Sequence, residues 1–237
     1  SDVEAMGAEP SAVVIGLAFP RDLDRRWVSD FQEGVVEECA RAGVSLVGGD
    51  LSSSPHIALG VTALGNLSGR PGITRAGARI GDQVAVCGRL GCSAGGLLVL
   101  QRGFGSPKDL VLEQQCPTVP YGQGKAAADA GATAMIDVSD GLLQDLGHIC
   151  ELSGVGIDVR TAALKIHDSL ARLAAATGKD PLGFVLAGGE DHALAATFPA
   201  QVELPQDWLR IGTVTSGAEV IVDGMPWTGS VGWDHFA

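Results

Sequence analysis

Residues 134–143, with the sequence AMIDVSDGLL, decide the fold class. Ala134, Met135 and Ile136 form a short apolar run typical of a buried strand, and this run ends at Asp137. Beyond Gly141, apolar residues recur at helical spacing, at Leu142, Leu143, Leu146, Ile149 and Cys150. A strand, a short polar turn and an amphipathic helix together form the basic unit of an α/β protein.

The same alternation continues on both sides of this unit. Strands are predicted at residues 12–19, 44–47, 57–65, 84–87, 155–159, 184–187 and 193–198. Helices are predicted between Asp22 or Asp24 and Gly43, and at residues 93–100, 124–130 and 169–177. Residues 103–124 show little periodicity and are expected to be irregular. We therefore expect an α/β (α+β) protein with mixed sheets flanked by helices.

Composition shifts to Gly, Arg and Pro over residues 69–81, where we place a domain junction. This predicts two domains, residues 1–69 and 70–237. The chain has 237 residues and a formal net charge of −12, which disfavours nucleic acid and an anionic membrane surface as partners. An acidic protein can still bind phosphorylated small molecules if its carboxylates hold divalent cations.

The five cysteines are scattered, without a CxxC pair or a zinc-ligand spacing. This pattern argues against a disulfide framework and predicts a reducing, cytoplasmic location. The sequence contains neither an apolar run long enough to span a membrane nor the pattern of a signal peptide.

Three short segments each place carboxylates beside glycine after a predicted strand: Gly48-Gly49-Asp50, Asp137-Val138-Ser139-Asp140-Gly141 and Gly188-Gly189-Glu190-Asp191. Ligands bind at strand ends in α/β sheets, and carboxylates gathered there need a cation, for which Mg²⁺ is the obvious candidate. The structural alternatives are a Ser139 or Asp140 N-cap for the next helix and an ordinary Gly-Asp turn. In the last segment, the second acid, Asp191, has no role in turn geometry, which favours a functional role for this segment over a structural one.

Other features are less specific. Arg70, Arg75 and Arg79 could clamp a phosphate or be solvated linker charges. The turn at residues 88–93 could offer amides to an anion, but it lacks the ending of a P-loop. His148 is expected to face solvent or to pack. The aromatic end, residues 231–237, predicts a docked segment that stacks on a ring or packs on the core.

Taken in order, the motifs resemble the thiamine-monophosphate kinase family, within the superfamily of aminoimidazole ribonucleotide synthetase-like ATP-dependent enzymes. The motifs are SDVEAMGA (1–8), VGGD (47–50), TRAGARIGD (74–82), MIDVSDGL (135–142), GGED (188–191) and GWDHF (232–236). The resemblance covers essentially the whole chain. It implies a two-domain fold, ATP-dependent phosphorylation of thiamine monophosphate to thiamine diphosphate by direct in-line transfer with Mg²⁺, and homodimers formed through the N-terminal domains.

The resemblance also assigns residues. It implies metal binding by Asp2, Asp50, Asp137 and Asp140, with Asp137, Asp140 and Arg75 as the catalytic group. It implies ATP contacts by Gly49, Asp50, Arg75 and Ser139, and thiamine contacts by Glu190 and Trp233.

The sequence departs from the family in three places. The family has a segment before Ser1 with further metal-binding aspartates, so the N-terminal domain is expected to be incomplete. His192 stands where an aromatic is frequent, and Leu51 where Thr is usual. Two alternatives stay open: an inactive fragment that only binds a thiamine phosphate, and a superfamily member with a different phosphoryl acceptor.

Overall fold

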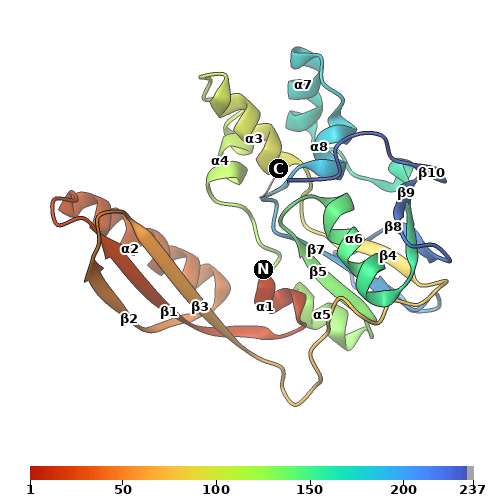
Figure 1. The fold of residues 1–237 in the computed structure, drawn as a ribbon, viewed down its shortest axis with the longest axis horizontal. Coiled ribbons are helices and arrows are strands. Elements are labelled where there is room, and N and C mark those ends of the chain that lie inside the picture. Colours follow the sequence, from red (N-terminus) through yellow and green to blue (C-terminus); the bar gives the residue numbers. More distant parts are fainter. Residues whose placement is uncertain (234–237) are drawn as a thin grey trace. The chain divides into compact units, whose positions relative to one another are not determined.

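The computed structural model describes residues 1–233. The chain forms two compact units: a larger unit of Ser1–Gly7 with Gly72–Ala237, and a smaller unit of Ala8–Pro71 (Figure 1). The smaller unit therefore ends two residues beyond the predicted junction, while Ser1–Gly7 lies with the larger unit rather than with residues 1–69. The reason is that helix α1 (Asp2–Ala5) packs against elements of the larger unit, namely helix α5 (Gln123–Asp129) and strand β5 (Ala134–Val138).

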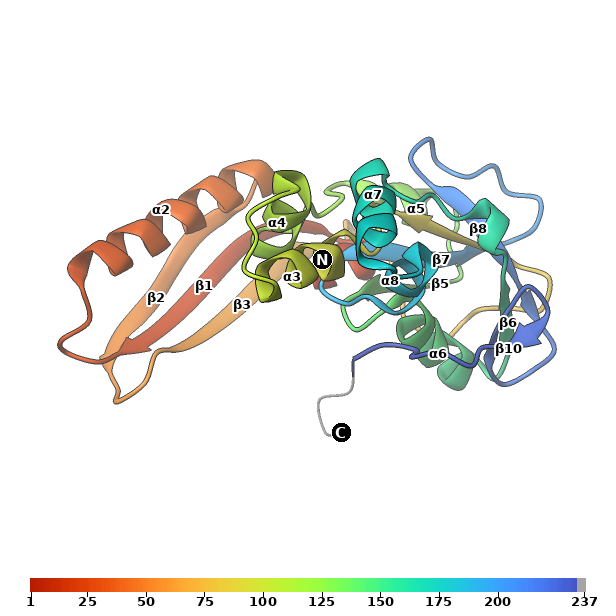
Figure 2. The same ribbon diagram turned by 90° about the horizontal axis from the view of Figure 1, so that it is seen from above.

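The smaller unit is one three-stranded sheet and one helix. The strand order is β2-β1-β3, with β2 parallel and β3 antiparallel to β1. The elements are β1 (Glu9–Phe19), α2 (Arg25–Ala42), β2 (Ser45–Ser53) and β3 (Ala58–Asn66). Helix α2 begins at the Asp24 cap, whose side chain accepts from the N–H of Arg26, and ends at Gly43 with φ 66°. Figure 2 shows α2 along one side of this sheet.

The larger unit is built on a seven-stranded mixed sheet in the order β10-β9-β6-β8-β4-β7-β5. Its strands are β4 (Gln83–Cys87), β5, β6 (Gly156–Val159), β7 (Ala193–Phe198), β8 (Leu209–Thr215), β9 (Val220–Val222) and β10 (Met225–Pro226). All neighbours are antiparallel except β6 and β9. The expected fold class, mixed sheets flanked by helices, is confirmed.

Both faces of strands β4, β7 and β5 are buried, because successive residues join different apolar clusters. In β5, Ala134 and Ile136 belong to one cluster and Met135 to the other. The first cluster packs against helices α3 (Cys92–Gln101), α4 (Lys108–Gln115), α6 (Leu142–Ser153), α7 (Asp168–Thr177) and α8 (Pro181–Ala187). The second cluster includes Ala5 of α1 and Ala127 of α5. The apolar side chains of β5 are therefore fixed by packing, which makes the C-terminal end of this strand a rigid platform for Asp137.

The two chain segments that link the units meet at one point of the larger unit, where the N–H of Ile73 donates to the carbonyl of Met6 at 3.0 Å. Gly7, which follows Met6, has φ 72°, and a Cβ on this residue would lie 2.9 Å from the Cβ of Ala128. Glycine is needed at this turn for both reasons.

Two of the predicted elements are wrong. Residues 103–124, expected to be irregular, contain helix α4, and the predicted strand at 184–187 is the second half of helix α8. Helix α8 carries an ordinary start signal, since Asp180 accepts from the N–H of Leu182 and Pro181 opens the helix. The short 3-10 turn at Thr161–Ala163 completes the elements. Within residues 1–233, no helix is long and apolar enough to cross a membrane.

Candidate active site

A cavity of about 460 Å³ lies at the C-terminal end of β5, within the larger unit. It is lined by Asp2, Ala5, Met6, Ile73, Thr74, Arg75, Met135, Ile136, Asp137, Ser139, Asp140, Asp145 and His148. Five residues singled out from the sequence, Asp2, Arg75, Asp137, Ser139 and Asp140, therefore line a single cavity although 138 positions separate the first from the last. Their individual roles stay predictions.

The backbone of the loop after β5 is hydrogen-bonded to the carboxylate of Asp145, a residue that no motif in the sequence indicated. Gly141 is the N-cap residue of helix α6 and the helix has no side-chain cap, so neither Ser139 nor Asp140 caps it. Instead, Oδ2 of Asp145 accepts from the N–H groups of Ser139, Asp140 and Gly141 at 3.0, 3.1 and 3.1 Å. Asp145 is 2% exposed, and burial raises its pKa to about 6. The structural alternative for Ser139 and Asp140 is thereby wrong.

Asp137 lies beside His192 and Ser1 at the edge of the cavity. The hydroxyl of Ser1 donates to Oδ2 of Asp137 at 2.8 Å and lies 3.1 Å from Nδ1 of His192. Burial alone would raise the pKa of Asp137, but the contacts with His192 and Ser1 outweigh burial and lower it. The neighbouring Asp137 in turn raises the pKa of His192.

The GGED segment, residues 188–191, lies between helix α8 and strand β7 and contacts the same loop. The N–H of Glu190 donates to the carbonyl of Ser139 at 2.7 Å, and the N–H of His192 to that of Val138 at 2.9 Å. Glu190 and His192 both have positive φ, at 64° and 51°, a conformation that side chains rarely adopt and that is frequent at functional sites. This segment follows helix α8, so the expectation that it follows a strand is wrong.

The second acid of this segment, Asp191, has a structural role. It is buried, and it accepts from the backbone N–H groups of Gly91 and Ser93 at the start of α3. Burial raises the pKa of Asp191 to about 7. The turn at residues 88–93, expected to offer amides to an anion, thus gives two of them to an internal carboxylate. Asp191 is not available as a ligand, contrary to the interpretation from sequence.

The C-terminal segment docks on the same loop. The N–H of Trp233 donates to the carbonyl of Asp140 at 2.9 Å, and Nε2 of Gln144 donates to the carbonyl of Trp233 at 2.7 Å. Trp233 is 63% exposed, which leaves its side chain accessible to a ligand. The rest of the predicted aromatic motif, Asp234, His235 and Phe236, lies outside the described residues.

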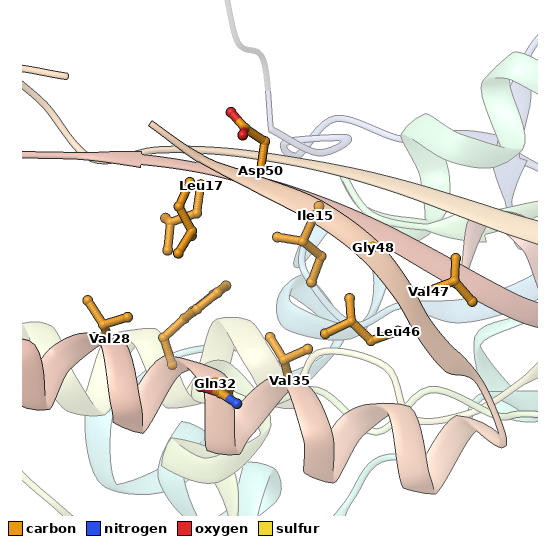
Figure 3. A pocket seen from close by; sticks show the side chains of 12 residues that line it. Ile15, Leu17, Val28, Gln32, Val35, Leu46, Val47, Gly48 and Asp50 are labelled. Atoms are coloured by element: carbon orange, nitrogen blue, oxygen red, sulfur yellow. The ribbon is translucent and has the colours of Figure 1, made fainter. Parts of the chain in front are cut away.

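Gly49 and Asp50 belong to the smaller unit and lie inside strand β2 rather than in a turn. β2 continues through them because it pairs with β1 as far as Ser53, and a Cβ on Gly49 would lie 2.0 Å from the carbonyl of Ile15. Figure 3 shows an apolar pocket between this sheet and α2, with Asp50 pointing away from the helix. Asp50 accepts a hydrogen bond from the hydroxyl of Ser52. The expected strand-end turn is therefore wrong at this position.

The three buried cysteines are not activated as nucleophiles. Burial raises the pKa of Cys87 and Cys92 to about 12 and that of Cys150 to about 11, so these thiols stay protonated at neutral pH.

The cavity suits a cation that is shared with a ligand. Asp2, Asp137 and Asp140 supply carboxylate oxygens, the donors that Mg²⁺ prefers. Among residues 1–233, no group of three or more His, Cys, Asp and Glu side chains could hold a metal ion by itself. Mg²⁺ commonly takes only one or two carboxylates and completes its shell with water and phosphate oxygens, so the residues present fit this mode of binding.

Sequence reasoning missed Asp145, His148 and the contact of His192. His148 was expected to face solvent or to pack, but it lines the cavity from α6. Asp145 and His148 are three residues apart, and this spacing places both on the helix face next to the Asp137–Gly141 loop. In the sequence, this three-residue spacing was the signal that could have identified Asp145 and His148 as cavity residues.

The chain matches two domain families over most of its length. Residues 1–67 match the AIR synthase related protein, N-terminal domain, and residues 79–224 match the AIR synthase related protein, C-terminal domain. Thiamine-monophosphate kinase of Mycobacterium tuberculosis (strain H37Rv) is 47% identical over 238 residues, which cover 100% of this chain and 71% of that protein.

Solved structures agree with these matches. The crystal structure of thiamine monophosphate kinase from Aquifex aeolicus superposes with a TM-score of 0.89 at 34% identity, covering 95% of this chain and 77% of that one. AaThiL complexed with AMPPCP and TMP superposes with a TM-score of 0.88 at 33% identity, covering 99% of this chain and 76% of that one. The chain therefore belongs to the AIR synthase related family and, within it, to the thiamine-monophosphate kinases.

Proposed function

We propose that the protein transfers the terminal phosphoryl group of ATP to the phosphate of thiamine monophosphate, forming thiamine diphosphate. The observation that carries this proposal is the convergence of Asp2, Arg75, Asp137, Ser139 and Asp140 on one cavity. A related structure holds an ATP analogue and TMP, which supports the same pair of substrates here.

The chemistry of phosphoryl transfer explains why these residue types gather. The transferred group carries its charge on peripheral oxygens, so catalysis depends on alignment and on positive charge around them. Arg75 would donate to these oxygens with its planar guanidinium. Asp2, Asp137 and Asp140 would hold Mg²⁺, which supplies charge neutralisation when bound. The attacking atom is a phosphate oxygen that is already largely ionised near neutral pH, so no general base is required.

Glu190 and Trp233 are the residues we assign to the thiamine moiety, which is cationic and aromatic. A carboxylate attracts its charge, and an indole face binds a cation through its quadrupole. Both residues are hydrogen-bonded through their backbones to the loop that carries Ser139 and Asp140. Acceptor recognition would thereby be tied to the loop that faces the transferred group.

We assign Gly49 and Asp50 of the smaller unit to ATP and metal binding. The side chain of Asp50 points away from α2, on the far side of the sheet from the helix, which leaves its carboxylate available for a polar ligand (Figure 3). This assignment predicts that Asp50→Asn raises the KM for ATP.

We further propose a homodimer formed through the smaller unit. Its strands β2 and β3 are edge strands with exposed apolar side chains, Leu46, Leu51, Leu59 and Val61 among them. Burying such a surface against a second copy would remove it from water. Light scattering after size exclusion should give twice the monomer mass, and Val61→Glu should shift it to the monomer.

A cytoplasmic location completes the proposal. All five cysteines are free thiols, as expected for a reducing compartment.

The test is an ADP-release assay on the complete polypeptide with ATP, Mg²⁺ and thiamine monophosphate. ADP release should depend on all three and should be absent with unphosphorylated thiamine. Turnover that ignores thiamine monophosphate would reject the proposal. Calorimetric binding of thiamine monophosphate without turnover would instead indicate a binding protein, and turnover with another phosphate acceptor would indicate a different branch of the superfamily.

A further inference from the structure

The loop between β5 and α6 is fixed on both of its sides. On the inner side, the three consecutive N–H groups of Ser139, Asp140 and Gly141 converge on one oxygen, Oδ2 of Asp145. On the outer side, the carbonyl of Ser139 accepts from Glu190 and that of Asp140 accepts from Trp233. Each peptide unit thus has its N–H turned inward and its carbonyl turned outward.

The two sets of hydrogen bonds depend on each other, because the N–H and the carbonyl on either side of a peptide bond point in opposite directions. The carbonyl of Ser139 and the N–H of Asp140 share one peptide plane, as do the carbonyl of Asp140 and the N–H of Gly141. When Asp145 holds the two N–H groups, it therefore also aims the two carbonyls at Glu190 and Trp233.

We propose that Asp145 is a positioning residue that sets the geometry of the acceptor-binding side of the cavity through the 139–141 backbone. It presents Asp140 to the cavity and fixes the anchoring points of Glu190 and Trp233 together. The inference deepens the proposed function and rests on it for the identity of the acceptor, but the state of the loop in the free protein does not depend on it.

The packing around Asp145 is consistent with a role that needs an accurately placed acceptor. Its own N–H donates to the carbonyl of Gly141 at 2.9 Å, so its backbone is part of the first turn of α6. Its side chain is buried and lines the cavity, and among residues 1–233 it forms no ion pair with a basic side chain. The anion is thus matched by backbone N–H groups, a common arrangement at helix starts.

The alternative is that Asp145 is itself a metal ligand, since it lines the same cavity. Two conservative variants separate the two roles. Asp145→Asn keeps an acceptor oxygen at the same distance from the backbone but removes the charge. Asp145→Glu keeps the charge but displaces the carboxylate by one methylene group, away from the three N–H groups.

The experiment compares these variants with Asp82→Asn in the complete polypeptide. Asp82 is a matched control, because it is also buried and its Oδ2 accepts from the N–H of Arg79 at 3.0 Å and the hydroxyl of Thr133 at 2.7 Å, outside this cavity. The readouts are amide hydrogen exchange at residues 139–141 in the free protein, Mn²⁺ binding followed by paramagnetic resonance, and the KM for thiamine monophosphate.

Positioning predicts that Asp145→Glu speeds exchange at residues 139–141 by about tenfold or more, the effect of losing one buried hydrogen bond. The KM for thiamine monophosphate should rise by a similar factor, while Asp145→Asn stays within about threefold of the wild type in both readouts. Asp82→Asn should change neither exchange at these amides nor the KM.

The inference is overturned if Asp145→Glu leaves exchange and KM unchanged. It is also overturned if Asp145→Asn abolishes Mn²⁺ binding while Asp145→Glu retains it, because dependence of Mn²⁺ binding on the charge of residue 145 identifies a metal ligand. If the wild type neither binds nor turns over thiamine monophosphate, the proposed function fails, while exchange at residues 139–141 still decides the role of Asp145.

Discussion

Replacing Glu4 by Gln tests how α1, which carries Asp2, is held in the larger unit. Glu4 is 1% exposed, and its two carboxylate oxygens accept from the N–H groups of Gly122 and Gly124, at 2.8 and 2.7 Å, where α5 begins. Gln has one acceptor oxygen in place of two. Whichever way its amide is turned, the NH₂ group faces a backbone N–H donor.

The cost follows from these contacts. One charge-assisted hydrogen bond is lost and one buried N–H is left without an acceptor, which together should lower the free energy of unfolding by about 2–4 kcal/mol. The backbones have little room to relax, since a Cβ on Gly124 would lie 1.9 Å from the carbonyl oxygen of Glu4. Because α1 also presents Asp2, the variant should need a higher Mg²⁺ concentration for half-maximal activity.

Urea unfolding followed by tryptophan fluorescence measures the change, since Trp208 is buried in the larger unit and packs edge-on against Phe198. Glu203→Gln is the control, because Glu203 is exposed and should leave stability unchanged. A loss below about 0.5 kcal/mol for Glu4→Gln would refute the reasoning, because it would mean that the two hydrogen bonds are worth no more than surface contacts.

Three further outcomes are expected. Asp137→Asn and Asp140→Asn should each lower kcat by more than about 100-fold in the ADP-release assay, the scale of losing a group that stabilises transition-state charge; near-normal turnover in both would make them structural. Glu190→Gln should chiefly raise the KM for thiamine monophosphate, and an effect confined to the KM for ATP would contradict its assignment. Burial raises the pKa of Asp191 to about 7 from 3.8, so the folded state binds this proton more tightly than the unfolded chain does. Its stabilising effect is present below pH 4 and is lost as pH rises towards 7, by up to about 4 kcal/mol in total. Asp191→Asn should therefore flatten the stability profile over that window, and an unchanged slope in denaturation between pH 4 and 8 would show that Asp191 does not titrate there.

The strand and helix on either side of Asp137 could be predicted because their periodicity is strong and both are buried on the expected faces. The GGD segment was mistaken for a turn, since glycine in a sequence does not reveal whether it bends the chain or lets a neighbouring backbone approach. At Gly49 it does the latter, against Ile15. The short α8 has an apolar interior that also suits a strand, and only Asp180 and Pro181 distinguish the two.

The roles of the aspartates were harder to predict than the strands and helices. Asp137, Asp140, Asp145 and Asp191 all lie near glycines in the sequence. The first three line the cavity, and Asp145 and Asp191 accept from backbone N–H groups. Which role an acid takes depends on where distant amides lie, as for Asp191 and Gly91, 100 positions apart. Local sequence does not contain that information.

The hydrogen bond between Ile73 and Met6 has a practical consequence. Residues 8–71 leave the larger unit and return to it at one spot, and neither of the two apolar clusters of the larger unit contains a residue of that insertion. A short glycine linker between Gly7 and Gly72 should therefore yield an autonomous fragment that retains the β5–α6 loop. That position is also a natural site for grafting a foreign module, such as a fluorescent reporter of acceptor binding.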